Sequence, residues 1–197
     1  MLTRIVLLLA LVLPVAASAQ SLTVTRGTGA SVKVDLAMGI ALNKTSSLTR
    51  EWVIVNDPEL PLQIESGSAA PAYVQERGRG DYRYLADYTV KASEAVTAYE
   101  VRFLVLDVFG VRQRLLSASE LTDIAADASH RDTGAWSLYS EADASTAFYS
   151  VAYVAAVRTA NGQVYRARVP AVLAEIQKIS SAIQASDIER EKPGPAR

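Results

Sequence analysis

The sequence predicts an all-β protein, a β-sandwich of about seven or eight short strands followed by a C-terminal α-helix. Apolar and polar residues alternate through most of the chain, which is typical of strands with one buried face. Turn-forming residues separate these segments at short intervals. Helical spacing is confined to the C-terminal part, which argues against a sheet with alternating strands and helices.

Residues 1–19 have the features of a secretory signal peptide. Basic Arg4 precedes an apolar run from Ile5 to Leu13, and Ala17-Ser18-Ala19 forms a small-residue cleavage site. The run is shorter than the roughly 20 residues that span a bilayer. We therefore expect cleavage after Ala19, a periplasmic or secreted protein, and no membrane insertion of the mature chain.

The composition excludes several classes of protein. Without cysteine the chain has no disulfide, so its stability must come from its core. A formal net charge of −1 argues against nucleic acid as a partner. A single histidine and no cysteine exclude ordinary structural zinc, and the spacing of Asp123, Asp127 and Asp132 matches no EF-hand calcium loop. We expect neither a metal nor a cofactor.

The predicted sandwich domain covers residues 20–169 and begins with short strands. Segment 32–36 alternates, and segment 51–55 is a continuous apolar run that ends in the turn Asn56-Asp57-Pro58. A short strand at 60–64 must lie at an edge or begin after Pro61. Residues 67–71, rich in small residues, then separate it from the next strand.

The middle of the domain predicts its central strands. Segment 82–90 is amphipathic, whereas segment 99–109 is apolar on both faces and should be central in a covered sheet. A hairpin follows at Gly110. Ser117 and Glu120 then match a capping box, which predicts a short helical turn followed by a loop and by a strand around Trp136.

A second hairpin and a helix close the chain. Asn161-Gly162 lies between two alternating segments and predicts a type I′ turn. Residues 170–188 predict one helix whose apolar stripe docks on the sheet, or in a partner's groove. The stripe consists of Val172, Leu173, Ile176, Ile179 and Ile183. Residues 189–197, rich in charge, Pro and Gly, predict a disordered tail.

Two segments carry a resemblance to a known family. They are "WVIVNDPELPLQI" at residues 52–64 and "VRFLVLDVFG" at residues 101–110. They resemble the small bacterial envelope modules of FxLYD type, in which a strand ends in Asn and a later strand ends in Phe-x-Leu-Tyr-Asp before a Gly turn. The second match has Val and Leu where the family has Leu and Tyr. The resemblance covers residues 50–170 and implies an immunoglobulin-like sandwich that is not catalytic.

Catalytic candidates are few. Ser129, His130 and Asp132 lie in one predicted loop, and neighbours in sequence rarely reach the geometry of a catalytic triad. Glu141 and Asp143 would lie about 7 Å apart on one face of an extended segment, which leaves a carboxylate hydrolase as an alternative. We expect no catalytic residue and no enzyme.

Two features are candidates for binding. Arg79-Gly80-Asp81 is the tripeptide that cell-adhesion receptors read, and we interpret it as part of an exposed turn before a strand. Tyr82, Tyr84 and Tyr88 share one strand face, which would suit a platform for sugars or proteins. We favour the core for this face, because its remaining residues are apolar and the opposite face carries the charges.

These observations lead to three hypotheses. The first is an exported, non-catalytic module that holds or bridges envelope proteins through a sheet edge or a loop surface. Its expected partner is another envelope protein. The second is a carbohydrate-binding module that uses surface Tyr and Trp, and the third is the carboxylate hydrolase. Exposed tyrosines would favour the second, and an open sheet edge would favour the first.

Overall fold

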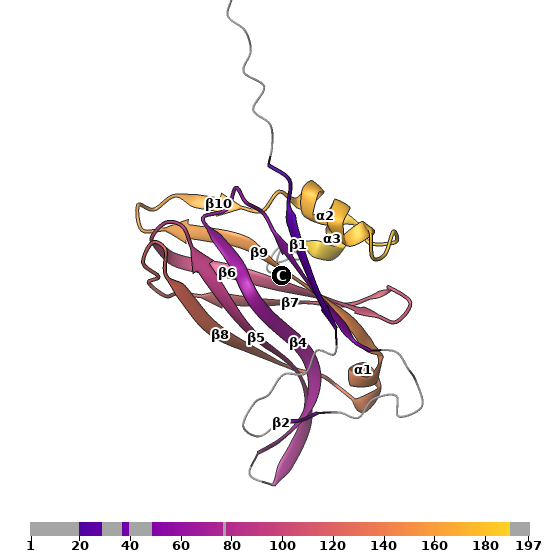
Figure 1. Cartoon of the computed structure of the whole chain (residues 1–197). Helices are drawn as coiled ribbons and strands as arrows, with labels where there is room; N and C mark the ends of the chain where they lie inside the picture. Colours follow the sequence, from indigo (N-terminus) through magenta and orange to yellow (C-terminus); the bar gives the residue numbers. More distant parts are fainter. Residues whose placement is uncertain (1–19, 29–36, 40–48, 77, 190–197) are drawn as a thin grey trace, which may run out of the picture.

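The computed structural model describes residues 20–28, 37–39, 49–76 and 78–189. The predicted signal peptide at 1–19, the predicted strand at 32–36 and the tail from residue 190 lie outside the described residues. Two β-sheets pack face to face, and two short helices cover part of the outer face of one sheet (Figure 1). The prediction of an all-β sandwich is therefore confirmed.

The first sheet, sheet A, has the strand order β1-β3-β9-β6-β7, with β10 beside β9. Its strands are β1 (Thr23–Thr28), β3 (Glu51–Asn56), β6 (Val96–Asp107), β7 (Arg112–Glu120), β9 (Ala147–Thr159) and β10 (Val164–Arg166). Strand β3 runs parallel to β9, and the other pairs are antiparallel. The segment predicted to be central because both faces are apolar is β6, which lies between β9 and β7.

The second sheet, sheet B, has the order β2-β4-β5-β8, with every pair antiparallel. Its strands are β2 (Ala37–Gly39), β4 (Leu62–Glu76), β5 (Arg79–Ala92) and β8 (Ser129–Ser137). Strand β4 has 15 residues and includes the segment 67–71 that the sequence assigned to a connection. The small residues there lie beside β5 in the sheet, and a Cβ on Gly67 would lie 2.9 Å from the Cβ of its pairing partner Tyr88.

The main core lies between the two sheets. Its largest fully buried side chains include Ile54, Leu62, Ile64, Tyr84, Tyr88 and Phe103. The ring of Tyr88 packs on Phe103 at 5.5 Å between centroids, and Phe103 packs on Trp136 at 5.4 Å. The tyrosine face of β5 therefore belongs to the core, as we favoured. Leu85 points to the other face, in a small cluster with Ala72 and Val74.

A second core lies between sheet A and the C-terminal helices. Helix α2 (Val169–Gln177) and helix α3 (Ala185–Ile188) are separate, so the single predicted helix is wrong in its continuity. The apolar stripe still docks on the sheet as expected, on side chains such as Val53, Leu104 and Val151. Ile188 anchors the end, because its carbonyl accepts hydrogen bonds from Tyr153 and from Arg102 Nη1.

Two hairpins in sheet A use the same turn. In the β6–β7 and β9–β10 connections a glycine has positive φ, 77° at Gly110 and 88° at Gly162, and its N–H bonds the carbonyl three residues earlier. The type I′ prediction for Asn161-Gly162 is wrong, because Asn161 does not have positive φ. Instead the Asn161 side chain accepts the Gln163 N–H at 3.0 Å, within a type I turn followed by a glycine bulge.

Tertiary pairing overrides three local predictions. Residues 117–120 continue β7 rather than forming a helical turn. Residues 129–134 belong to β8, not to a loop, although the face of β8 that points inward carries polar side chains and so lacks an apolar period. Glu141 and Asp143 are not extended but lie in helix α1 (Glu141–Thr146), which Ser140 caps.

Candidate interaction site at the edge of strand β8

Strand β8 is an edge strand over its whole length. It pairs with β5 from Lys91↔Ser129 to Arg83↔Ser137, nine residues without a bulge, and within the described residues it pairs with no other strand. The strand contains no proline. Such an edge presents a row of backbone N–H and C=O groups on which a further strand can form.

Two hydrogen bonds establish which β8 residues direct their backbone N–H and C=O groups to the free edge. The Ala92 N–H bonds the Ala128 carbonyl at 3.0 Å, and the Leu138 N–H bonds the Tyr82 carbonyl at 2.7 Å. Bonded and non-bonded pairs alternate along an antiparallel ladder, so the even-numbered residues bond to β5. The odd-numbered residues therefore turn their N–H and C=O groups to the free edge. These are Ser129, Arg131, Thr133, Ala135 and Ser137.

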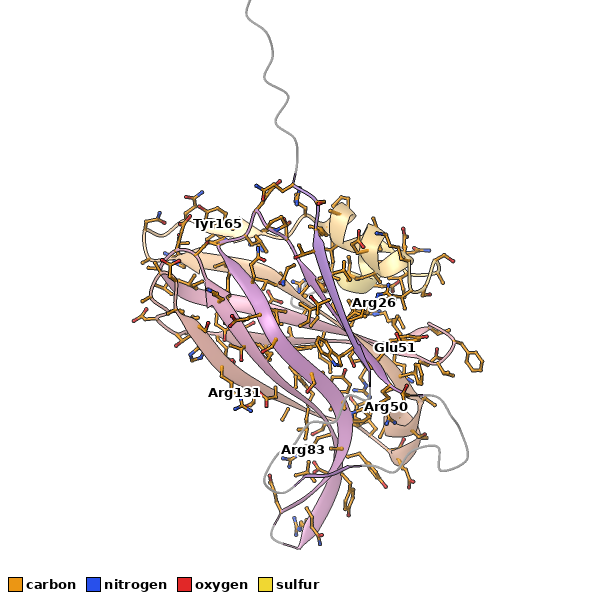
Figure 2. The ribbon with its side chains drawn as sticks, viewed as in Figure 1. Arg26, Arg50, Glu51, Arg83, Arg131 and Tyr165 are labelled. Carbon is orange, nitrogen blue, oxygen red and sulfur yellow. The ribbon has the colours of Figure 1, made fainter. Side chains whose placement is uncertain are left out.

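Side chains leave this edge accessible. Four of the five outward residues are small, and the fifth is Arg131, which Figure 2 labels on β8. Its Nε and Nη2 donate to the two carboxylate oxygens of Asp87 at 2.8 and 2.5 Å. The hydrogen bonds from Arg131 lower the pKa of Asp87 despite partial burial. The longest side chain is thus tied to the sheet face rather than standing over the edge.

One backbone donor in the middle of the edge, the N–H of Thr133, is already hydrogen-bonded to the Asp132 side chain. Its Oδ1 accepts the Thr133 N–H at 2.7 Å, while Oδ2 accepts the hydroxyls of Tyr88 and Tyr99 at 3.1 Å each. Burial, with the nearby Asp132 charge, raises the pKa of both phenols, so they stay protonated and donate. A partner strand would find the Thr133 N–H already bonded.

The other long edges are interrupted. Strand β4 has a bulge between Ile64 and Ser66 and contains Pro71, both of which discourage strand addition. On β7 the Ser117 carbonyl accepts the indole N–H of Trp136 at 3.3 Å. Trp136 is half-buried and lies across Gly134, where a Cβ would overlap the indole ring. The β8 edge therefore remains the longest regular one among the described strands.

Arg79-Gly80-Asp81 begins β5 and does not form a loop. The three residues pair with Glu76, Gln75 and Val74, and the turn itself contains Gly78 at φ 79°. Gly80 is required by the phenol of Tyr73, which a Cβ would overlap, and Asp81 forms an ion pair with Arg83 at 3.1 Å. The three residues therefore lie in a strand rather than in the expected turn, although Arg79 and Gly80 are exposed as expected.

The three candidate tyrosines do not form a surface platform. Tyr84 and Tyr88 are 0 % and 2 % exposed. Burial raises the pKa of Tyr84, whose hydroxyl hydrogen-bonds Ser150. Tyr82 is half-buried and donates to Glu141 at 3.0 Å, which raises the pKa of Tyr82. A sugar could stack on Tyr84 or Tyr88 only if the sandwich opened.

The catalytic candidates do not converge. Ser129 lies on the outer face of β8, where it donates to Glu65 at 3.0 Å, while His130 and Asp132 point to the opposite face. Asp143 lies 3.9 Å from Arg114. Among the described residues no group of three or more His, Asp or Glu side chains is placed to hold a metal ion. The described part also has no helix with the length and hydropathy of a membrane span.

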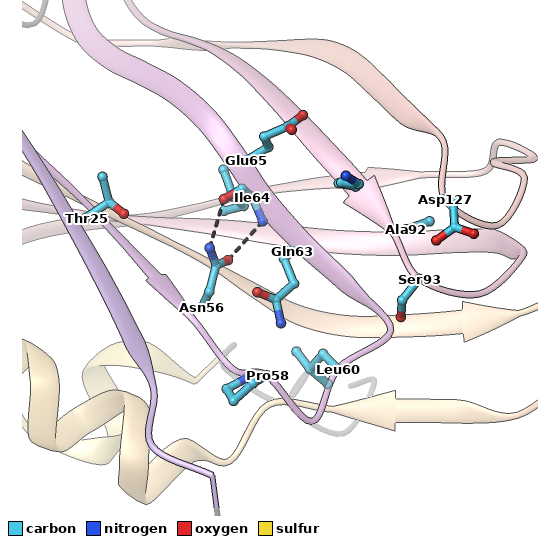
Figure 3. Close-up of a pocket in the computed structure, with 11 residues that line it drawn as sticks. Thr25, Asn56, Pro58, Leu60, Gln63, Ile64, Glu65, Ala92, Ser93 and Asp127 are labelled. Atoms are coloured by element: carbon cyan, nitrogen blue, oxygen red, sulfur yellow. Dashed lines mark hydrogen bonds between the residues drawn. The ribbon is translucent and has the colours of Figure 1, made fainter.

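A polar pocket of about 470 Å³ lies beside β1 and the β3–β4 turn (Figure 3). Asn56 is on its wall, but the Asn56 amide accepts the Ile64 N–H at 2.9 Å and donates to the Ile64 carbonyl at 2.8 Å. This amide therefore joins β3 to β4 at the bulge. The sequence indicated Asn56 as a turn residue but did not indicate this link between the two sheets.

A buried ion pair ties the same turn to the start of α2. The carboxylate of Asp57 accepts three hydrogen bonds from the guanidinium of Arg168, at 2.7 to 3.2 Å, as well as the Arg168 and Glu59 backbone N–H groups. Burial raises the pKa of Asp57, but these bonds outweigh it and hold the pKa below its usual value. The pair is structural, because each of the three guanidinium nitrogens of Arg168 contacts an acceptor within the fold.

Comparisons with known proteins add one solved structure. No family model matches the chain, and no curated protein matches it. A protein from Peptoclostridium difficile 630, described as a hypothetical protein, is similar over 59% of this chain and 91% of its own, with 10% identity and a TM-score of 0.43.

Proposed function

We propose that this protein is an exported, non-catalytic module that binds an extended segment of another envelope protein along the free edge of β8. The observation that carries this proposal is the regular, nine-residue edge whose outward side chains are small or held back. Addition of a strand to an exposed sheet edge is a recurring mode of peptide recognition. Main-chain hydrogen bonds supply affinity, and side chains on alternate residues supply specificity.

The number of free backbone groups on the edge limits the affinity that strand addition alone can give. Five outward residues offer ten backbone groups, and nine remain once the Thr133 N–H is subtracted. At about 1 kcal/mol per net hydrogen bond, and with roughly 4–15 kcal/mol lost on association, main-chain pairing alone gives weak binding. Specific binding then requires side-chain contacts, and the outer face around Arg131 and Thr133 is the surface that would make them.

Export and the immunoglobulin-like topology belong to the same proposal. Residues 1–19 support export through their basic start, apolar run and cleavage site. Strands β4, β5 and β8 of one sheet face β7, β6, β9 and β10 of the other, as strands A, B and E face C′, C, F and G in immunoglobulin-like sandwiches. This arrangement supports the fold that the FxLYD resemblance implies.

The test uses a proline on the free edge. Ala135→Pro removes an outward N–H that takes no part in pairing with β5, and proline is tolerated at such edge positions. Ala135→Ser keeps the N–H and is the matched control. A photoreactive residue replacing Ser137 would then be used in the protein's own cells to cross-link whatever lies on the edge.

We expect one reproducible cross-linked protein for the native chain and for Ala135→Ser, and its loss in Ala135→Pro. Thermal unfolding of the purified variants checks that both remain folded. An unchanged cross-linked product in a folded Ala135→Pro variant would show that the partner does not add to this edge. Absence of any product with the native chain would also count against the proposal.

A further inference from the structure

Strand addition at β8 would bring a second set of partner side chains to the protein, on the inner face of the strand. Side chains alternate between the two faces of a strand, so every other residue of an added segment turns toward the space between the sheets. On β8 this inner face consists of His130, Asp132, Gly134 and Trp136, all of them half-buried. The inner residues Tyr88 and Val90 of the neighbouring β5 are buried instead. The inner face of β8 is therefore accessible from the free edge.

The link between β7 and β8, residues 121–128, is held at the end of the sandwich. Ile124 forms a bridge with Val96 at the start of β6, and the Asp127 N–H bonds the Ala92 carbonyl at the end of β5. In the part of the chain that the structure describes, β8 pairs with β5 alone. A strand that adds to β8 therefore has no link residue to displace from the ladder.

Asp132 is the acidic residue of this inner face, and its carboxylate is fixed in position. Oδ2 accepts two tyrosine hydroxyls, and Oδ1 accepts the Thr133 N–H at the edge itself. A carboxylate offers about four acceptor positions, so Oδ1 can accept one more hydrogen bond. That position is the one nearest the free edge, because the other oxygen is used inside the sandwich.

The charge of Asp132 is not neutralised by the cation next to it in sequence. Arg131 lies on the outer face of β8, where it forms an ion pair with Asp87 at 2.5 Å. Among the described residues, no lysine or arginine forms an ion pair with Asp132. The inner face of the edge therefore presents a negative charge.

A second carboxylate, that of Glu120 at the end of β7, strengthens this negative charge. Glu120 pairs with Tyr99, whose hydroxyl bonds Asp132, so the two acids lie on the same side of the sandwich. Burial and then the charge of Asp132 raise the pKa of Glu120, although His130 nearby lowers it. No described lysine or arginine forms an ion pair with Glu120 either. A cation that approaches this edge is attracted by both acids.

The geometry of pairing places one residue of an added strand beside Asp132. The odd-numbered residues of β8 would exchange hydrogen bonds with an antiparallel partner, so the even-numbered residues lie in non-bonded pairs. Side chains are closest in such pairs, where the Cα atoms are about 4.5 Å apart. The partner residue two positions earlier lies opposite Gly134, whose inner side is covered by the indole of Trp136. Its side chain would contact that ring.

We propose that the segment added to β8 carries a lysine or an arginine opposite Asp132 and an apolar residue opposite Gly134. This inference rests on the proposed function and names the kind of segment that fits it. The cationic side chain donates to Oδ1 of Asp132, and an acidic residue in its place is repelled. Cross-strand pairs of opposite charge stabilise a ladder, whereas like charges destabilise it. Asp132 thus determines specificity, and apolar-x-basic is the pattern of the partner segment.

The test selects nine-residue peptides of random sequence, displayed on phage, on the immobilised mature chain. A selected peptide is then synthesised with a fluorescent label, and its Kd is measured by anisotropy. Asp132→Asn keeps the size of the side chain and an oxygen for the Thr133 N–H, and it removes the charge. The control Asp123→Asn removes an exposed acid of the link. Thermal unfolding checks that both variants are folded.

We expect the selected peptides to share a lysine or arginine with an apolar residue two positions before it. Replacing the basic residue by glutamine should weaken binding to the native chain and to Asp123→Asn about fivefold, the effect of an opposite-charge cross-strand pair. On Asp132→Asn the same replacement should change the Kd by less than about twofold. Added salt should reduce the difference between the two peptides on the native chain, a check that needs no protein variant.

The outcomes separate this inference from the proposed function. Peptides that lose binding to Ala135→Pro but share no basic residue would leave strand addition standing and overturn the pattern. An equal loss with the glutamine peptide on Asp132→Asn, or a difference that salt does not change, would also overturn it. Peptides that bind Ala135→Pro as tightly as the native chain do not add to β8, and both proposals would then be wrong. Recovery of no binding peptide would contradict both.

Discussion

Replacing Arg168 by Met leaves the buried carboxylate of Asp57 without its cation. The change removes three hydrogen bonds from the guanidinium to Asp57, the ion pair with Glu59 at 2.8 Å and the bond to the Gln20 carbonyl at 2.9 Å. Two backbone N–H donors to Asp57 remain.

The loss in the free energy of unfolding can be estimated from the donors that still bond Asp57 in the variant. Breaking a fully buried ion pair costs about 3–5 kcal/mol, and the two remaining donors with the partial exposure of Arg168 place this case near the lower end, at ~3 kcal/mol. Asp57→Asn in the same background removes the stranded charge. The double variant should therefore lose less than the sum of the single variants, by about 1–2 kcal/mol.

The pH dependence has a definite sign. In the native protein the pKa of Asp57 lies below its unfolded value, so the pair's contribution is present above that unfolded value, near 4, and is lost as pH falls through the folded pKa. In Arg168→Met burial instead raises the pKa of Asp57. The gap in stability between the two proteins should therefore be largest at pH 7 and shrink as the solution is acidified.

Urea unfolding of both proteins from pH 7 down to pH 3, below the unfolded pKa of Asp, measures this gap. The reasoning is refuted if Arg168→Met costs less than about 1 kcal/mol at pH 7, the upper range of an exposed pair. It is also refuted if the gap does not change with pH, because the loss would then come from packing alone.

Substitutions at three further positions test the fold. Gly134→Ala should push the indole of Trp136 off β8, costing about 1–3 kcal/mol from overpacking and changing tryptophan fluorescence; an unchanged emission spectrum would show that the ring lies elsewhere. Asn56→Ala should cost about 2 kcal/mol in urea unfolding, since it leaves the Ile64 N–H and carbonyl unpaired, and Asn56→Asp should cost at least as much, because a carboxylate oxygen would face the Ile64 carbonyl in place of the Nδ2 donor. Gly162→Ala should lower the melting temperature, with a cost of about 1 kcal/mol from positive φ, and no change would contradict the turn geometry.

Strands that carry their own apolar pattern were predictable. Three strands show this: β3 is a continuous apolar run, β5 alternates, and β6 is apolar on both faces. In each the order of apolar and polar side chains along the strand matches the faces that are buried. The tyrosine face of β5 could be assigned to the core for the same reason, because Ala86 and Val90 share that face. The docking of α2 likewise follows from its apolar stripe.

Elements defined by their neighbours could not be predicted. Strand β4 passes through small residues and Pro71, where pairing with β5 matters more than intrinsic strand propensity. The strand around Trp136 was predicted, but residues 129–134 of β8 were not, because His130, Asp132 and Gly134 on the inner face give no apolar period.

The candidate site depends on the same information. An edge is a property of the whole sheet, since a strand is at an edge only when no other strand lies beside it. The sequence suggested a sheet edge or a loop surface without indicating which one. Phe109-Gly110 was interpreted only as a turn. The high exposure of Phe109 could not be predicted, because it depends on how the β6–β7 hairpin projects from the sheet.

The central claim is that β8 presents its odd-numbered amides to a partner. Residue-resolved hydrogen exchange of the free mature protein tests it most directly. We expect alternation along the strand, with fast exchange at Arg131, Ala135 and Ser137 and slow exchange at the even-numbered residues bonded to β5. Thr133 should be slower than its odd-numbered neighbours because Asp132 accepts its N–H. Uniform protection along β8 would mean that the edge is already covered, and the claim would be wrong.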